Sequence, residues 1–247
     1  MTLDLKPIVH PTFELTIPST SKKVSSRPIV TRERKALLTA LESGETSGIN
    51  RVVKDIVGAC VKNVVVDELT TFDFEWIFLQ LIINSIKETI DLEVRIPDRD
   101  EECGECGKVR LLKVNLRDAK IEGIATSKKD FLVEVSDGLS LKLKYPSEHD
   151  LVILQDIAKD KNELEQLTDL ISICIDSVFD ESGTKKFNQF DYKTKIDFLD
   201  SLPIPVTDKL ERFIKAIPKL SLRLVIECPK CKFKAFHEMS GLSDFFV

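Results

Sequence analysis

The chain has few of the residues on which most enzyme sites depend. Its 247 residues include only three histidines and nine glycines. No segment matches a nucleophile elbow, a phosphate-binding loop or a dinucleotide fingerprint, motifs that need glycines at fixed spacing. The sequence therefore gives no support for a hydrolase or a nucleotide-dependent enzyme, and we expect the protein to be non-enzymatic.

Long apolar runs are also missing. No run reaches the roughly 18 to 20 residues that a membrane span requires, and the first residues lack the basic and apolar regions of a secretory signal. The proportions of 43% hydrophobic and 31% charged residues are those of a folded globular protein. We therefore expect no membrane span, and a reducing compartment in which closely spaced cysteines are metal ligands or redox centres more often than disulfides.

Four of the six cysteines form two pairs with the spacing of metal-binding knuckles, each pair between two segments that resemble β-strands. The pairs are Cys103-Gly-Glu-Cys106 and Cys228-Pro-Lys-Cys231. Two such turns complete a tetrahedral shell of four thiolates, which leaves no position for a substrate or an activated water. We predict a structural zinc ion bound by Cys103, Cys106, Cys228 and Cys231. A redox centre, an iron–sulfur cluster and cysteines without metal remain as alternatives, and His237 is a further candidate ligand.

The two knuckle segments carry opposite charge. Residues 91–106 contain seven acidic and two basic residues, whereas residues 209–234 contain eight basic and two acidic residues. Such segments attract each other, and lysines beside a four-thiolate zinc centre offset its negative charge. This favours one shared site. The net charge of −5 argues against a general polyanion binder, but the basic segment, with Phe233 and Phe236, leaves a zinc-ribbon nucleic-acid-binding regulator as the alternative function.

Polarity patterns predict an α+β fold of helical segments and short antiparallel hairpins, with a zinc-ribbon-like pair of C-x-x-C knuckles. We expect four regions in one compact unit: an extended or hairpin segment over 1–30, a helical region over 31–118 that ends in the first knuckle hairpin, a β-hairpin region over 119–146, and a helical region over 147–247 that ends in the second knuckle hairpin.

The expected elements follow from the same patterns. Helices are predicted over 31–43, 49–61, 73–89, 147–159, 162–178, 192–201 and 206–217. Strands are predicted over 12–17, 23–29, 92–96, 109–116, 131–135, 139–145, 220–226 and 233–239, and a polar loop over 181–188. Thr31 is expected to be an N-cap, and the mostly apolar segment 72–83 to be a core helix. Cys60 and Cys174 are expected to be core thiols. The apolar tail 242–247 is expected to fold back onto the core or to insert into a partner.

The order of several segments resembles that of the baseplate hub and hub-assembly proteins of T-even-type contractile-tailed bacteriophages. The segments span nearly the whole chain. They are 11–20, Arg27-Pro28, 32–38, 69–79, 144–146, 198–202, 218–220, the Cys228 knuckle and 241–246.

This resemblance implies a protein of virus tail morphogenesis, either a hub component or a factor that helps the hub to form. Its partners would be other baseplate and tail hub proteins, and it would act in the host cell cytoplasm during assembly or in the tail baseplate of the virion. Such a role needs no catalytic residue. The acidic insertion Asp98 to Glu102 in the first knuckle departs from the simpler pattern of the family and puts its metal geometry in doubt.

Overall fold

The chain forms two compact units, each built from segments that are distant in sequence. The computed structural model describes residues 8–97, 103–125, 127–157 and 161–245. Unit 1 is formed by the chain up to Val66, by Phe72–Glu122 and by the chain from Lys219 onward, and unit 2 by Asp67–Thr71 and Gly123–Pro218. The predicted α+β class is confirmed. The four sequence regions and their union in one compact unit stay a prediction.

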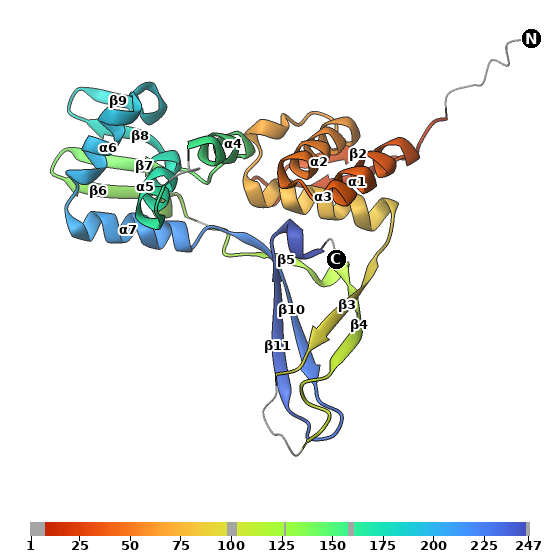
Figure 1. Cartoon of the computed structure of the whole chain (residues 1–247). Helices are drawn as coiled ribbons and strands as arrows, with labels where there is room; N and C mark the ends of the chain where they lie inside the picture. The colour runs from red at the N-terminus through yellow and green to blue at the C-terminus, as the bar shows by residue number, and fades with distance from the viewer. Residues whose placement is uncertain (1–7, 98–102, 126, 158–160, 246–247) are drawn as a thin grey trace, which may run out of the picture. The chain divides into compact units, whose positions relative to one another are not determined.

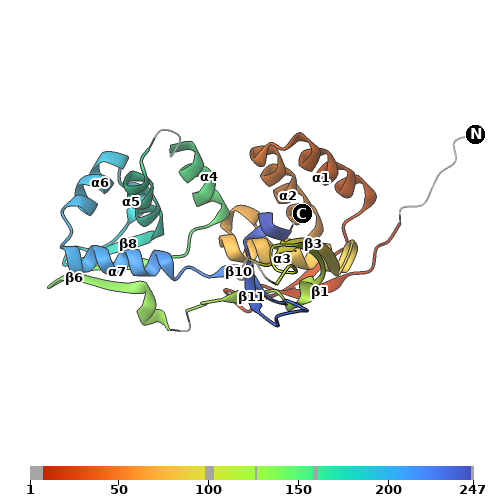
Figure 2. The same ribbon diagram turned by 60° about the horizontal axis from the view of Figure 1, so that its bottom comes forward.

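Unit 1 contains an N-terminal hairpin, three helices and two longer hairpins (Figures 1 and 2). Its helix α3 is the centre of the core: it is apolar on nearly every side, and Ile77, Phe78 and Leu81 have no exposed surface. The N-terminal hairpin is joined to this helix because the buried carboxylate of Asp73 accepts hydrogen bonds from the backbone and hydroxyl of Ser19. The elements of these parts are β1 (Phe13–Thr16), β2 (Lys23–Ser26), α1 (Thr31–Ser43), α2 (Thr46–Cys60) and α3 (Thr71–Ser85).

The two longer hairpins of unit 1 form a ribbon that extends away from these helices (Figure 1). Buried and exposed side chains alternate along its strands, so each hairpin has one buried face. A short strand pairs antiparallel with the first three residues of β10, Lys219–Ser221, and thereby holds the C-terminal hairpin in unit 1. The strands are β3 (Thr89–Arg95), β4 (Val109–Asn115), β5 (Lys120–Glu122), β10 (Lys219–Glu227) and β11 (Lys234–Ser240).

Unit 2 is an antiparallel sheet of four strands in the order β6-β7-β8-β9, packed with helices. The turn between β6 and β7 contains Asp137-Gly138, with Gly138 at a φ of 78°, as the Asp-Gly signal predicted. Leu141, Leu143 and Val178 of the sheet pack with Leu210 of α7 in one core. The elements are β6 (Leu132–Ser136), β7 (Leu139–Leu143), α4 (Glu148–Ile157), α5 (Glu163–Cys174), β8 (Ile175–Asp180), β9 (Gly183–Lys186), α6 (Tyr192–Asp200) and α7 (Ile204–Lys215).

Short 3₁₀ turns complete the two units. They are Val66–Glu68, Leu116–Asp118, Lys128–Phe131, Phe187–Gln189 and Leu242–Phe245. Phe245 is buried, so the tail folds back onto the core up to this residue, and its predicted continuation, Phe246 and Val247, lies outside the described residues. No helix among the described residues has the length and apolarity that a membrane crossing requires.

Four local expectations were wrong. Ile175–Val178, predicted as the end of a helix, lies in strand β8, because β7 and β9 provide partners on both of its sides. The expected polar loop contains β9, whose exposed residues are held in the sheet by backbone pairing alone. Thr31 is the first helical residue and Val30 is the N-cap. The three residues of β5 carry no strand pattern of their own and were not predicted.

The start of α1 is held by a partly buried ion pair. The Glu33 carboxylate accepts hydrogen bonds from the backbone amide of Val30, at 2.9 Å, and from the Arg27 guanidinium, at 2.5 and 3.0 Å. Burial alone would raise the pKa of Glu33, but these hydrogen bonds outweigh burial and lower the pKa below its ordinary value. Glu33 therefore binds the backbone amide of the N-cap residue, while Val30 provides no side-chain cap of its own.

We predict that Glu33→Ala lowers the free energy of unfolding by about 2–3 kcal/mol, because Arg27 and the Val30 amide lose their partner. Glu42→Ala, at an exposed position of the same helix, is the control and should change stability by less than about 0.5 kcal/mol. The Glu33 contribution is complete above the ordinary pKa of a glutamate and is lost as the pH falls through its lowered folded pKa. Urea unfolding from neutral to acidic pH measures both effects; equal stabilities of the two variants would contradict the assignment.

Candidate metal centre

The candidate site lies at the tips of the two ribbon hairpins of unit 1. Cys103 and Cys106 lie in the turn between β3 and β4, and Cys228 and Cys231 in the turn between β10 and β11. Backbone hydrogen bonds close each turn: the Gly107 amide donates to the Ile96 carbonyl at 2.9 Å, and the Cys228 amide to the Phe233 carbonyl at 2.8 Å. Each hairpin therefore presents its two cysteines from a tight turn, as the sequence predicted.

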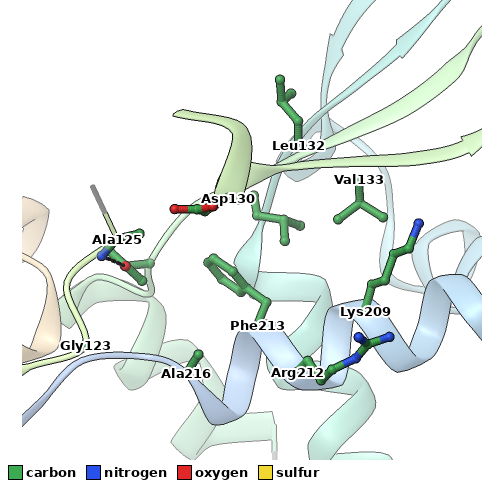
Figure 3. A pocket seen from close by; sticks show the side chains of 11 residues that line it. Gly123, Ala125, Asp130, Leu132, Val133, Lys209, Arg212, Phe213 and Ala216 are labelled. Carbon is green, nitrogen blue, oxygen red and sulfur yellow. Dashed lines mark hydrogen bonds between the residues drawn. The ribbon is translucent and has the colours of Figure 1, made fainter. Parts of the chain in front are cut away.

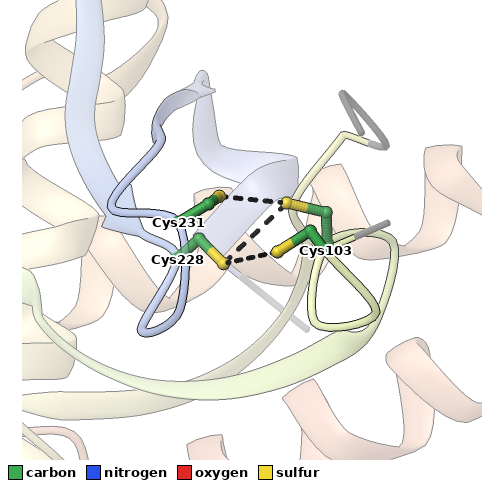
Figure 4. Close-up of side chains that lie close together, drawn as sticks. Cys103, Cys228 and Cys231 are labelled. Carbon is green, nitrogen blue, oxygen red and sulfur yellow. Dashed lines mark hydrogen bonds between the residues drawn. The ribbon is translucent and has the colours of Figure 1, made fainter. Parts of the chain in front are cut away.

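The structure brings all four predicted cysteines together (Figure 4). Cys103 Sγ and Cys228 Sγ are 3.8 Å apart, Cys106 Sγ and Cys228 Sγ 3.8 Å, and Cys106 Sγ and Cys231 Sγ 3.6 Å. The four sulfur atoms all lie within 4.8 Å of one another. Four thiolates that bind one zinc ion at about 2.3 Å in a tetrahedron are separated by about 3.8 Å. The cluster therefore has the size of a four-thiolate zinc shell.

These distances exclude disulfides within the cluster. A disulfide joins its sulfur atoms at about 2.0 Å, and all six cysteines of the chain are free thiols. Three cluster cysteines are buried and Cys231 is exposed. The remaining two, Cys60 and Cys174, are buried in the cores of units 1 and 2, and burial raises the pKa of each to about 12. Their prediction as core thiols is confirmed.

Backbone amides point at the first sulfur of each turn in the same way. Those of Glu105 and Cys106 bind the sulfur of Cys103 and lower its pKa to about 6. The amides of Cys231 and Lys230 likewise lower the pKa of Cys228. In both turns the donors are the residues two and three positions after the cysteine. Such donors stabilise a thiolate, which is the form that binds metal.

The pKa of Cys106, the second cysteine of the first turn, is raised and not lowered. Burial and the neighbouring sulfurs of the cluster raise the pKa of Cys106 to about 12. Several thiolates cannot lie this close together without a compensating positive charge, because each raises the cost of ionising the next. A divalent cation supplies that charge, so the arrangement suits a metal site better than a cluster of reactive thiols.

Charged groups of the two turns also meet. Lys230 Nζ donates to the Cys103 carbonyl at 2.7 Å. Lys108, whose Nζ is 2.7 Å from the Glu105 carboxylate, lowers the pKa of Glu105 most, and the charges of Arg110 and Lys230 lower it further. The attraction between the basic and acidic segments was predicted, but the contact of Lys230 was not. The feature of the sequence that could have suggested this contact is the position of Lys230 between Cys228 and Cys231. The acidic insertion Asp98 to Glu102 lies outside the described residues. His237 is an exposed residue of β11 and is not one of the clustered ligands.

The two hairpins of the ribbon resemble each other. Both hairpins have the order strand, C-x-x-C turn and strand. In both turns the sulfur of the first cysteine accepts hydrogen bonds from the backbone amides two and three residues later. The preceding helices do not correspond, because α3 belongs to unit 1 and α7 to unit 2. The likeness therefore extends over two zinc-ribbon-like hairpins and no further.

Unit 2 contains a cavity of about 460 Å³ between α7 and the start of β6 (Figure 3). Its walls are largely apolar and include Val133 and Phe213, with Lys209 and Arg212 of α7 on one side and Asp130 on the other. None of the residues that line the cavity is a serine, threonine, cysteine or histidine. The polar groups around the largely apolar cavity are those of Asp130, Tyr145, Lys209 and Arg212.

Comparison with known proteins adds one finding. Residues 10–247 match the model of a protein family described as "T4 bacteriophage base plate protein". No curated protein matches the chain, and no solved structure matches it. The family match includes both units and all four clustered cysteines.

Proposed function

The chain belongs to the family of T4 bacteriophage base plate proteins, and we propose that it serves there as a hub component or a hub-assembly factor. A phage baseplate protein has a structural role and contacts other baseplate proteins at the tail. The assignment to the hub is supported by the segments between Pro11 and Phe246 whose order resembles hub and hub-assembly proteins. In this proposal the protein acts through protein–protein contacts without catalysis, and it acts in the host cell cytoplasm while the tail is being assembled.

The proposal includes a structural zinc ion held by Cys103, Cys106, Cys228 and Cys231. The observation that supports it is the closed cluster of four sulfur atoms from two turns that are distant in the chain, with Cys103 and Cys228 125 residues apart. A bound ion would link the tips of both hairpins and neutralise the charge of the thiolates. Because protons compete with the metal for thiolates, we expect the ion to be released on acidification.

Cys228→Ser and Cys231→Ser should each lose zinc and lower the melting temperature by about 5–10 °C, because the binding energy of a site formed only on folding contributes to stability. Cys174→Ala, in the core of unit 2, is the matched control: it leaves a small cavity that lowers the melting temperature, but it should keep one zinc ion per chain. Elemental analysis and calorimetry measure both quantities. A serine variant with full metal content and an unchanged melting temperature would contradict the proposal that these cysteines bind zinc.

The hub assignment predicts a specific partner. When the tagged chain is produced together with the hub proteins of its phage, we expect one hub protein to co-purify in a fixed ratio, and a head protein of the same phage, used as control, not to. Deletion of the gene should yield tails without a complete baseplate.

Normal baseplates after deletion would contradict the hub proposal. So would retention on DNA or RNA that falls steeply with salt, in the absence of any hub partner, since this is the behaviour of the alternative nucleic-acid-binding regulator.

A further inference from the structure

The outer face of the β10–β11 hairpin carries an ordered patch of six residues, which we call the outer patch. The strand register places Arg223 opposite Glu238, Val225 opposite Phe236, and Glu227 opposite Lys234. Residues directly opposite each other in an antiparallel pair point to the same face, and so do residues two positions apart along a strand. The six side chains therefore form three rows on one surface.

The middle row of the outer patch is apolar and exposed. Val225 retains 56% and Phe236 72% of their accessible surface, whereas the neighbours Ile226 and Ala235 point to the other face and are buried. Single exposed apolar residues are common on protein surfaces. Here two large ones lie side by side, and an exposed phenylalanine is the kind of residue that is enriched at the centre of interfaces.

Each of the two outer rows pairs one positive with one negative residue, and the positions of the two charges are exchanged between the rows. Arg223 and Glu238 are 3.9 Å apart, Lys234 and Glu227 3.8 Å, and the side chains of all four are largely exposed. Each strand has one positive residue followed by one negative residue, and because the strands are antiparallel, each positive residue lies opposite a negative one. Exposed pairs of this kind contribute little by themselves, so their charges are available to a partner. The net charge of the patch is zero, which does not suit a polyanion.

We propose that the outer patch binds the outer patch of a second copy of this chain. Consider two copies face to face, related by a two-fold axis that runs parallel to the strands. Arg223 of each copy then faces Glu238 of the other, and Glu227 faces Lys234. All four contacts between the copies join opposite charges, while the apolar rows meet in the middle. The patch is therefore complementary to itself, as the interface of a two-fold dimer must be.

Side-chain volume favours this axis over the perpendicular one. With the axis parallel to the strands, each Phe236 packs on a Val225 of the other copy. The two side-chain pairs in the middle row then have the same combined volume, so the copies can approach equally closely at both pairs. An axis perpendicular to the strands also pairs opposite charges, now Arg223 with Glu227. It would, however, stack the two phenylalanines on each other and leave a gap between the two valines, which costs contacts.

The patch is small, and this determines the kind of association that we expect. Stable dimers bury about 800 Å² on each partner, more than three rows on two strands provide. The dimer should therefore be weak in dilute solution, and prominent where an assembly holds two copies near each other and raises their effective concentration. This inference depends on the hairpin alone and stands whether or not the hub assignment does.

Sedimentation equilibrium of the full chain with its metal tests the proposal. The natural chain should dimerise with rising concentration, and Phe236→Ser should weaken the dimer at least about tenfold, since each dimer buries two phenylalanines. Leu111→Ser, on the exposed face of the other hairpin at 66% exposure, is the matched control and should leave the dimer unchanged. Circular dichroism and metal content should show that both variants are folded.

Charge reversal tests the axis. Arg223→Glu alone and Glu238→Arg alone should each prevent dimerisation, because like charges then face each other twice. An equimolar mixture of the two variants should form a dimer again, because every contact between the copies joins opposite charges. With the perpendicular axis, the glutamate introduced by Arg223→Glu would face Glu227 of the other copy, and mixing would not restore the dimer.

Three results would overturn the proposal. The first is a chain that stays monomeric up to millimolar concentration. The second is a dimer that Leu111→Ser weakens and Phe236→Ser does not, which would place the interface on the β3–β4 hairpin. The third is a monomer that binds a single-stranded oligonucleotide and loses this binding in Phe236→Ser, which would assign the exposed phenylalanine to base stacking.

Discussion

Four sulfur atoms converge at the tips of two hairpins of unit 1, and in our proposal the stability of these hairpins depends on the ion that the sulfur atoms would bind. The tips are far from the helical core (Figure 1), and two-stranded hairpins of this length are marginally stable by themselves. Each hairpin has one buried face along its length, and the four sulfur atoms of the two turns meet at the end. A metal ion bound there, as we propose, would oppose fraying of both hairpins at once.

Strand pairing at the base of the ribbon places the C-terminal segment of the chain in unit 1. β5 pairs with the first residues of β10, which returns the C-terminal segment to unit 1 after the excursion through unit 2. The cysteine turns can meet only because of this return. The exposed Phe236 belongs to the ribbon of unit 1, whereas the cavity beside Lys209 and Arg212 belongs to unit 2.

The parts of the fold that were predicted correctly have strong local signals. Cysteine spacing predicted that the four cysteines meet, Asp137-Gly138 predicted a hairpin turn, and the apolar segment around Phe78 predicted the central helix. Where the prediction failed, the outcome depends on pairing with distant residues. The apolar run at Ile175–Val178 is compatible with either helix or strand, and β7 and β9 decide between them. The short β5 is a strand only because β10 lies beside it. The sequence left open whether Phe236 is exposed, and the pairing of β10 with β11 decides that it is.

X-ray absorption at the zinc edge of the purified chain tests whether one ion is bound by four sulfur atoms of two distant turns. We expect one zinc ion per chain with four sulfur neighbours at about 2.3 Å and no nitrogen or oxygen ligand. A shell of two sulfurs completed by lighter atoms would mean that each turn binds its own ion. That result, or a folded chain without metal, would contradict the shared zinc site.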